Sequence, residues 1–276
     1  MCGTCGCADP TNEVTLNDPE TGAVSVLCSG HGHHHGHEHG HDHYHHHDHD
    51  HPHDHSHDSG GRVIKLEQAV LAENDMNAMR NRGWFEGRGI LALNLVSSPG
   101  AGKTSLLEET IKSLAGEVEI AVIEGDQMTS NDADRIVAAG AKALQINTGA
   151  GCHLEADMVA AAAKQLNPGQ GAVLMIENVG NLVCPALFDL GERMKVAIIS
   201  TTEGDDKPLK YPHMFAASEV VLVNKLDLAP YVDFAAERME ANIKSVNPDA
   251  QVFMLSAKTG EGMPVWLDFL NGLRRE

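Results

Sequence analysis

One short segment restricts the possible folds of this chain more than any other feature. Residues 90–96 form an apolar run, Ile-Leu-Ala-Leu-Asn-Leu-Val, and residues 97–104 follow as Ser-Ser-Pro-Gly-Ala-Gly-Lys-Thr. A strand, a glycine-containing loop, a Lys-Thr pair and a helix in this order are typical of a loop whose backbone N–H groups surround a phosphate at a helix N-terminus. The order therefore predicts a phosphate-binding loop, and the competing interpretation is a glycine-rich turn before an ordinary helix.

Each side chain of the predicted loop has a physical role. Lys103 would reach the β- and γ-phosphates of a nucleotide, and the Thr104 hydroxyl would bind Mg²⁺. Glycines allow the backbone to approach the phosphates closely. The loop departs from the usual consensus at its first position, where Ser97 replaces glycine. The predicted nucleotide-binding residues here are Gly100, Ala101, Gly102, Lys103, Thr104 and Ser105.

Apolar runs alternate with helical stretches along the rest of the chain. Continuous apolar strands separated by helices favour a mostly parallel sheet with helices on both faces, the α/β architecture of P-loop nucleotide-binding proteins. A nucleotide is then expected at the carboxyl ends of the strands. The expected strands are 90–96, 118–124, 142–147, 172–177, 194–200, 219–224 and 251–256. The expected helices are about 66–82, 103–115, 131–139, 153–166, 207–217, 231–246 and 263–273.

A second motif selects the base. Residues 224–227 read Asn-Lys-Leu-Asp after the apolar run 220–223. A carboxylate at a strand end can accept hydrogen bonds from N1–H and N2–H₂ of guanine, and adenine has no such donor pair, so the site would discriminate strongly. We expect Asp227 to select guanine, Asn224 to contact N7 and O6, and the Lys225 stem to lie over the purine. A surface loop of common polar residues is the alternative.

The last predicted strand is also followed by a short polar turn. Residues 256–260 read Ser-Ala-Lys-Thr-Gly. Alone this turn would be a weak signal, since small polar turns commonly follow strands. As the third member of an ordered set it predicts backbone donors for the base O6, supplied by Ser256, Ala257 and Lys258.

Two further segments after strands are candidate switches. Asp126 is placed to bind Mg²⁺ through water or to orient the attacking water. Glu177 ends another apolar strand and would lie in the outer shell of Mg²⁺, while the Gly180 N–H is expected to contact the γ-phosphate. An ordinary acidic residue at a strand end or helix start is the alternative for both acids. The candidate catalytic residues are Lys103, Asp126 and Glu177, and the candidate Mg²⁺ ligands are Thr104 and Asp126.

The first 60 residues differ in composition from the rest. The formal net charge is −19, and residues 1–61 contain ten Asp or Glu and no Lys or Arg. From His31 to His57 every odd position is histidine, and the residues between them cannot form a core. We therefore predict a disordered metal-binding tail over 1–60 and a GTPase domain, preceded by its own helix, over 61–276.

The tail contains two predicted metal-binding features. Cys2, Cys5 and Cys7 can surround one ion, and with the α-amine of Cys2 they would form an S₃N set suited to Ni²⁺, with tetrahedral Zn²⁺ as the competitor. Imidazoles are mostly neutral at pH 7, so the histidine tract would store several ions weakly. A solvated spacer is the alternative for the tract. The predicted storage ligands are His33, His35, His37, His39, His41, His43, His45, His47, His49, His51, His53 and His55.

The composition also excludes several classes of protein. No basic stripe is present, so nucleic acid is not an expected partner. No secretory signal and no run of about 18 apolar residues occur, so we expect neither export nor a membrane span. The six cysteines do not resemble a disulfide framework and are interpreted as thiols or metal ligands. We expect a cytoplasmic protein.

The ordered motifs resemble the HypB family, the SIMIBI-class GTPases that assist nickel insertion into [NiFe]-hydrogenase. The resemblance extends from about residue 63 to the C-terminus. It implies GTP and Mg²⁺ binding, slow GTP hydrolysis, a GTP-dependent homodimer, Ni²⁺ as cargo, and a nickel-chaperone protein and the hydrogenase large subunit as partners. The segments that carry it are 97–104, 124–135, 151–153, 177–185, 205–215, 224–227 and 256–260.

The resemblance also implies a second metal site, at the dimer interface, formed by Cys152, His153 and Cys184. Taken singly, each residue is more typical of a core cysteine or a solvated histidine. Cys184 follows Gly180 by four residues, inside the segment expected to sense the γ-phosphate. We therefore expect GTP and GDP to give different metal geometries, so that hydrolysis shifts metal occupancy.

Two other functions compete with a nickel-delivering GTPase. One is a metal-storage protein with a vestigial nucleotide site, which the intact set Lys103, Thr104, Asp126 and Asp227 disfavours. The other is a related chaperone GTPase for urease or a cobalamin enzyme. The cysteines near the N-terminus and the Cys152-His153 pair disfavour that second alternative, because the urease chaperone of this fold carries a Cys-Pro-His motif instead.

Overall fold

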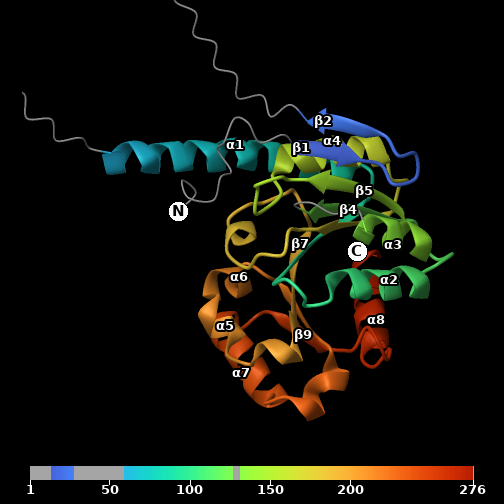
Figure 1. Cartoon of the computed structure of the whole chain (residues 1–276), viewed down its shortest axis with the longest axis vertical. Helices are drawn as coiled ribbons and strands as arrows, with labels where there is room; N and C mark the ends of the chain where they lie inside the picture. Colours follow the sequence, from blue (N-terminus) through green and yellow to red (C-terminus); the bar gives the residue numbers. More distant parts are fainter. Residues whose placement is uncertain (1–13, 28–58, 127–130, 276) are drawn as a thin grey trace, which may run out of the picture.

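The computed structural model describes residues 14–27, 59–126 and 131–275, which form a nine-stranded sheet with helices on both faces (Figure 1). The strand order is β2-β1-β5-β4-β6-β3-β7-β8-β9. The strands are β1 (Val14–Asn17), β2 (Val24–Leu27), β3 (Leu91–Ser97), β4 (Ile120–Asp126), β5 (Lys142–Asn147), β6 (Val173–Glu177), β7 (Met194–Ser200), β8 (Val220–Asn224) and β9 (Gln251–Met254). The α-helices are α1 (Ser59–Gly87), α2 (Lys103–Ser113), α3 (Asn131–Ala139), α4 (Ala156–Leu166), α5 (Lys207–Lys210), α6 (Pro212–Ala216), α7 (Ala236–Val246) and α8 (Met263–Leu273).

The alternation of side chains along the central strands divides the core into two layers. Strand β3 sends Leu93 and Leu95 to one face, where they join a cluster with α2, α3 and α8. Ala92 and Val96 point to the opposite face, which α1 and α4 cover at one end and α6 and α7 at the other. Strands β3 to β9 are parallel, and because β3, β4 and β6 to β8 are almost entirely buried, their sequences are continuous apolar runs. The predicted mostly parallel α/β sheet is confirmed.

The first described segment departs from the prediction of a tail without regular structure. Strands β1 and β2 form an antiparallel hairpin, and β1 pairs antiparallel with β5 at the edge of the main sheet. Val14 and Leu16 are buried against the core beneath α4, whereas Val24 and Val26 of β2 are exposed. Two alternating apolar residues suffice to add a strand to an existing edge, although they are too few to predict one.

Several helix limits also differ from those predicted. The N-terminal helix is longer than expected, because α1 has 29 residues rather than the predicted span 66–82. The predicted helix 207–217 is divided into α5 and α6, and Pro212 starts the second piece. The helix expected from residue 231 begins only at Ala236, after the 3₁₀ turn Leu226–Tyr231. The last two differences occur where proline or a short turn interrupts a helical pattern.

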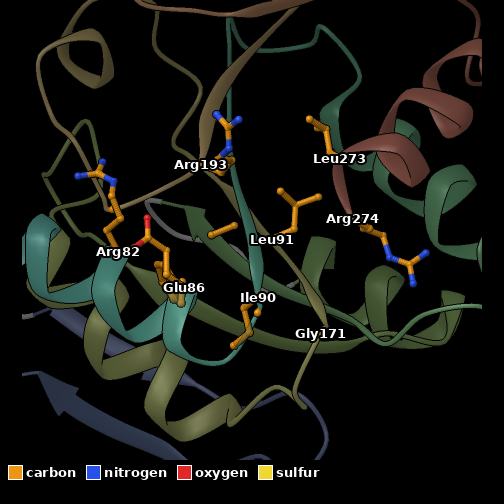
Figure 2. A pocket seen from close by; sticks show the side chains of 12 residues that line it. Arg82, Glu86, Ile90, Leu91, Gly171, Arg193, Leu273 and Arg274 are labelled. Carbon is orange, nitrogen blue, oxygen red and sulfur yellow. The ribbon is translucent and has the colours of Figure 1, made fainter. Parts of the chain in front are cut away.

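A cavity of about 900 Å³ opens at the end of the sheet where β3 begins. Figure 2 shows Arg82 and Glu86 of α1 on one side and Leu273 and Arg274 on the other. None of the predicted site residues lines this cavity, because the glycine loop follows the opposite end of β3. Among the described residues, no helix is long and apolar enough to span a membrane.

Candidate nucleotide and metal site

The glycine loop between β3 and α2 has the backbone conformation that phosphate binding requires. Gly100 and Gly102 have φ values of +78° and +92°, in the left-handed region that favours glycine. At Gly102 a Cβ atom would also lie 2.7 Å from Nδ2 of Asn224. Glycine is therefore required there both by the backbone conformation and by the neighbouring side chain.

The Lys103 ammonium lies directly over the loop. Its Nζ donates to Ser97 Oγ at 2.8 Å and lies 3.9 Å from Oε1 of Glu177. Ser97, the departure from the consensus, thus gives the lysine a hydrogen-bond partner on the loop. Oγ1 of Thr104 donates to the same Glu177 oxygen at 3.2 Å. The loop, the start of α2 and the end of β6 therefore meet at one carboxylate.

A second buried carboxylate lies beside the first. Glu124 on β4 is in register with Glu177 on the neighbouring strand β6, and the side chains are 2% and 4% exposed. Burial raises the pKa of Glu124 to about 9, and the negative charge of Glu177 contributes to this increase. Burial also raises the pKa of Glu177 to about 7, and the nearby Lys103 opposes this increase. Removal from water disfavours the charged form of both groups.

This pair fits the Mg²⁺ that P-loop nucleotide-binding proteins use. Oε2 of Glu124 and Oε2 of Glu177 are buried and have no hydrogen-bond partner among the described residues. Carboxylate and hydroxyl oxygens are the ligands that Mg²⁺ prefers, directly or through water. Thr104, Glu124 and Glu177 are therefore suited to hold the ion, which would neutralise charge on the phosphates.

The predicted base-binding segments lie together at the carboxyl ends of β8 and β9. Oδ1 of Asp227 accepts a hydrogen bond from Ser256 Oγ at 2.7 Å. Lys225 has a left-handed φ of +61°, and its Nζ donates to the Gly100 carbonyl at 2.6 Å. The structure thus places Asp227 and Lys225 between the glycine loop and the turn that begins at Ser256.

The amide of Asn224 has partners other than those predicted. Its Nδ2 donates to the Ala101 carbonyl at 3.1 Å, and its Oδ1 accepts from the Ala257 N–H at 3.1 Å. The side chain is 2% exposed. Asn224 therefore joins the glycine loop to the 256–260 turn, beside the expected position of the base.

The remaining predicted nucleotide residues lie around the same edge. Ser105 Oγ accepts from Arg135 of α3 at 3.4 Å, which connects α2 to the second candidate switch. Asp126 ends β4, and its carbonyl accepts from the Thr148 N–H at 2.9 Å. Lys258 is exposed in the turn after β9.

The predicted metal ligands Cys152, His153 and Cys184 converge on one point. Their potential ligand atoms all lie within 4.8 Å of one another, although Cys152 and Cys184 are 32 positions apart. The two Sγ atoms are 3.0 Å apart, and Sγ of Cys152 is 3.6 Å from Nδ1 of His153. Two thiols and an imidazole form a soft donor set suited to Ni²⁺ or Zn²⁺.

The loop before α4 determines how the ligands are presented. The predicted start of this helix at about residue 153 is wrong, because α4 begins at Ala156 and Glu155 has extended backbone angles. Cys152 and His153 lie in a bend before the helix, where neighbouring side chains can turn toward one ion, which they cannot do within a helix.

Burial sets the protonation state of the imidazole. His153 is 4% exposed, and its ring packs on Phe188 with centroids 3.9 Å apart. Burial lowers the pKa of His153 to about 4. The imidazole is therefore neutral at pH 7, which is the form that binds metal.

The segment after β6 connects the glycine loop to this metal site. Gly180 lies so close to Pro99 that a Cβ atom would be 3.3 Å from the proline. The side chain of Asn178 accepts from the Leu154 N–H at 3.1 Å, and Asn181 donates to the Cys152 carbonyl at 3.3 Å. Cys184 follows on the same segment. The chain from 178 to 184 thus contacts the phosphate loop and the metal ligands.

Two residues in this region were not identified as functional from the sequence. Glu124 follows the apolar run 120–123 of β4 in the same way that Glu177 follows the apolar run 173–176 of β6, and that repeated pattern could have identified it. Asn178 carried no signal, because an asparagine after a strand is common in turns. The predicted ligands Cys2, Cys5, Cys7 and the histidine tract lie outside the described residues.

The fold and this site define a P-loop nucleotide-binding protein. Residues 91–254 match the family described as "CobW/HypB/UreG, nucleotide-binding domain". The chain is 55% identical over 213 residues to hydrogenase maturation factor HypB of Escherichia coli strain K12, covering 77% of this chain and 73% of that protein. The chain therefore belongs to the HypB family of hydrogenase maturation factors, which are GTPases.

Solved structures support the same assignment. The crystal structure of HypB from Archaeoglobus fulgidus is similar with a TM-score of 0.69 at 40% identity, over 74% of this chain and 99% of that chain. HypB from Helicobacter pylori in complex with nickel is similar with a TM-score of 0.69 at 37% identity, over 74% and 95% of the two chains. The second relative was solved with the metal that the donor set here suits.

Proposed function

We propose that this chain is a GTP-hydrolysing nickel metallochaperone, in which the bound nucleotide controls the Cys152/His153/Cys184 site. The observation that carries the proposal is the segment 178–184, which packs against the glycine loop at Gly180 and ends at a metal ligand. A change at the γ-phosphate would shift this segment and alter the spacing of the ligands. Differential affinity of the two nucleotide states for Ni²⁺ follows from such a shift.

Within this proposal each nucleotide residue has a distinct task. Asp227 selects guanine, and Asn224 contacts N7 and O6 of the base while its amide also holds the glycine loop. Lys103 leaves Ser97 and Glu177 to bind the β- and γ-phosphates. Thr104, with Glu124 and Glu177, binds Mg²⁺, and Asp126 orients the attacking water or contacts the ion through water.

The metal site is completed by a second copy of the chain. One chain supplies two thiolates and one imidazole, fewer than the four ligands of a closed site. Val183 and Leu187, on either side of Cys184, are 51% and 58% exposed, so a partner can cover them. We infer a GTP-dependent homodimer that holds Ni²⁺ and delivers it, with a nickel-chaperone protein, to the hydrogenase large subunit.

The N-terminal ligands have a separate task in the proposal. Cys2, Cys5 and Cys7 bind one Ni²⁺ tightly, and the histidine tract stores further ions that exchange quickly. Zn²⁺ competes at the thiolate sites, because thiolates and imidazoles suit both metals.

The proposal is tested with the purified chain and in cells. GTP hydrolysis is measured for the parent chain and for Lys103→Ala, which should lose turnover because the phosphate charge is no longer balanced. Hydrogenase and urease maturation are then measured in a strain lacking the gene, complemented with the parent, Lys103→Ala or Cys184→Ala. Recovery of hydrogenase by the parent alone supports the proposal, and recovery by all three chains contradicts it.

A further inference from the structure

Two asparagines on one face of α1 are buried, although helix interiors rarely bury this residue type. Asn74 and Asn81 are 4% and 5% exposed. They are seven residues apart, so they lie on the same side of the helix, with Ala78 between them. A buried amide without a hydrogen bond is destabilising, so both side chains are expected to have hydrogen-bond partners.

Each asparagine joins the two segments that carry the metal ligands. We call residues 152–156 the first arm and residues 184–190 the second arm. Asn74 accepts from the Ala156 N–H at 2.9 Å on the first arm and donates to the Asp189 carbonyl at 2.8 Å on the second. Asn81 donates to the Ala156 carbonyl at 2.7 Å and to the Leu190 carbonyl at 3.0 Å. Both side chains therefore bridge the arms.

Further contacts hold α1 closely against the second arm. Arg82 donates from one nitrogen to both carboxylate oxygens of Asp189 at 2.8 Å. Gly191 has a φ of +87°, and a Cβ atom there would lie 2.6 Å from the Ala78 carbonyl oxygen. The helix can approach to this distance only because residue 191 is glycine, so its position relative to the arm is narrowly defined.

The arms are fixed to each other near the ligands as well. The ring of Phe188 on the second arm packs against His153 on the first. Lys195 of β7 donates to the carbonyls of Pro185 and Phe188, at 2.8 Å and 3.2 Å, and so holds the second arm against the sheet. The backbone carbonyls of the second arm thus accept hydrogen bonds both from the sheet, through Lys195, and from α1, through the two asparagines.

We propose that Asn74 and Asn81 are positioning residues that clamp the two arms at the separation the metal site needs. The inference rests on the proposed function of the Cys152/His153/Cys184 site. Asn178 of the nucleotide-sensing segment holds Leu154, and the clamp holds Ala156 two residues further on. The clamp therefore fixes the first arm at Ala156. Because this end cannot follow, a movement of Asn178 shifts His153 and Cys152 relative to Cys184.

The clamp comes from outside the shared nucleotide-binding domain. The family match begins at residue 91, whereas α1 ends at Gly87. The same helix continues toward the N-terminal residues that contain the other predicted metal ligands. The geometry thus connects the metal site to a helix that the common domain does not include.

The test uses the full chain with Cys2, Cys5, Cys7 and Cys28 replaced by serine, so that every Ni²⁺–thiolate absorption band arises from Cys152 and Cys184. The band is titrated in this parent and in Asn74→Ala, Asn81→Ala and the double variant. Changes to groups that orient metal ligands commonly weaken binding 10–100-fold. We expect Ni²⁺ affinity about tenfold weaker in the double variant, an altered band, and GTP turnover close to that of the parent.

Two control variants separate positioning from general destabilisation. Asn77→Ala removes a half-buried asparagine of the same helix whose side chain accepts from Arg80 within α1 rather than from either arm, and should leave the band unchanged. Ile111→Val on α2 weakens the core on the opposite face of the sheet, in a cluster that includes no residue of either arm, and should lower the melting temperature without altering the band. If the double variant binds Ni²⁺ with the parent's affinity and spectrum, the clamp is overturned.

A measurement without metal separates this inference from the proposed function. Hydrogen exchange of peptides covering 150–158 and 184–192 is followed in the metal-free parent and double variant. Faster exchange in both peptides of the variant supports the clamp even if the parent binds no Ni²⁺, which would contradict only the proposed function. Unchanged exchange in the variant overturns the clamp whatever the parent binds.

Discussion

Replacing Glu124 by glutamine should stabilise the nucleotide-free chain, and the gain should increase with pH. Burial raises the pKa of Glu124 to about 9 from 4.5, with the charges of Glu177, Asp132 and Asp126 adding to the effect. The folded chain therefore binds a proton that the unfolded chain releases above pH 4.5. Stability falls as pH rises through this window and levels off above the folded-state pKa.

The magnitude follows from the two pKa values. Each pH unit within the window costs about 1.4 kcal/mol of unfolding free energy. The cost of Glu124 is small at pH 5.5, about one unit above its ordinary pKa of 4.5, and is close to its full value at pH 8, about one unit below its folded-state pKa. Glutamine has nearly the same shape and does not ionise. The stability difference between Glu124→Gln and the parent should thus increase by about 3 kcal/mol from pH 5.5 to pH 8.

Urea unfolding of the nucleotide-free and Mg²⁺-free chain at the two pH values measures this difference. Glu240→Gln, on the exposed side of α7, is the matched control and should give the same small change at both pH values. An equal stability change for Glu124→Gln at pH 5.5 and pH 8 would refute the reasoning, because Glu124 would then ionise as it does in water.

Three further predictions concern nucleotide and metal binding. Gly102→Ala should weaken GTP binding at least tenfold in a fluorescent-nucleotide titration, since its Cβ would lie 2.7 Å from Asn224; Gly116→Ala, also at positive φ but in open space, should bind normally. Asp227→Asn should weaken GTP about 10²-fold and favour a xanthine nucleotide, whose C2 oxygen accepts from the new amide; unchanged GTP affinity would exclude Asp227 from base selection. Deleting residues 31–58 should lower bound Ni²⁺ per chain in equilibrium dialysis without lowering GTP turnover, and lost turnover would contradict a storage role.

Much of the fold could be predicted because parallel strands buried on both faces leave a clear signal. Most of the seven parallel strands are buried apolar runs, and the glycine loop marks the end of the sheet at which ligands bind. The hairpin β1–β2 could not be predicted, because its stability comes from the edge of β5 rather than from its own sequence. Pro212 divides a helix that a periodic pattern alone extends across it.

Site residues could be predicted from the sequence only where they belong to motifs that rarely occur outside nucleotide-binding sites. Lys103 and Asp227 belong to ordered motifs, whereas Cys152 and Cys184 follow strands β5 and β6, which are separated by β4 in the sheet. Spacing alone could not bring those cysteines together, and the family resemblance supplied the link. Buried asparagines such as Asn74 look like ordinary surface residues in a sequence, because their importance lies in partners far along the chain.

The central claim is that the bound nucleotide changes the affinity of the Cys152/His153/Cys184 site for Ni²⁺. Ni²⁺ is titrated into the chain loaded with GDP or with a non-hydrolysable GTP analogue, for the parent and for Cys184→Ala. The account predicts different affinities in the two nucleotide states of the parent and a single, weaker affinity in the variant. Equal affinity in both states, unaffected by loss of Cys184, would contradict it.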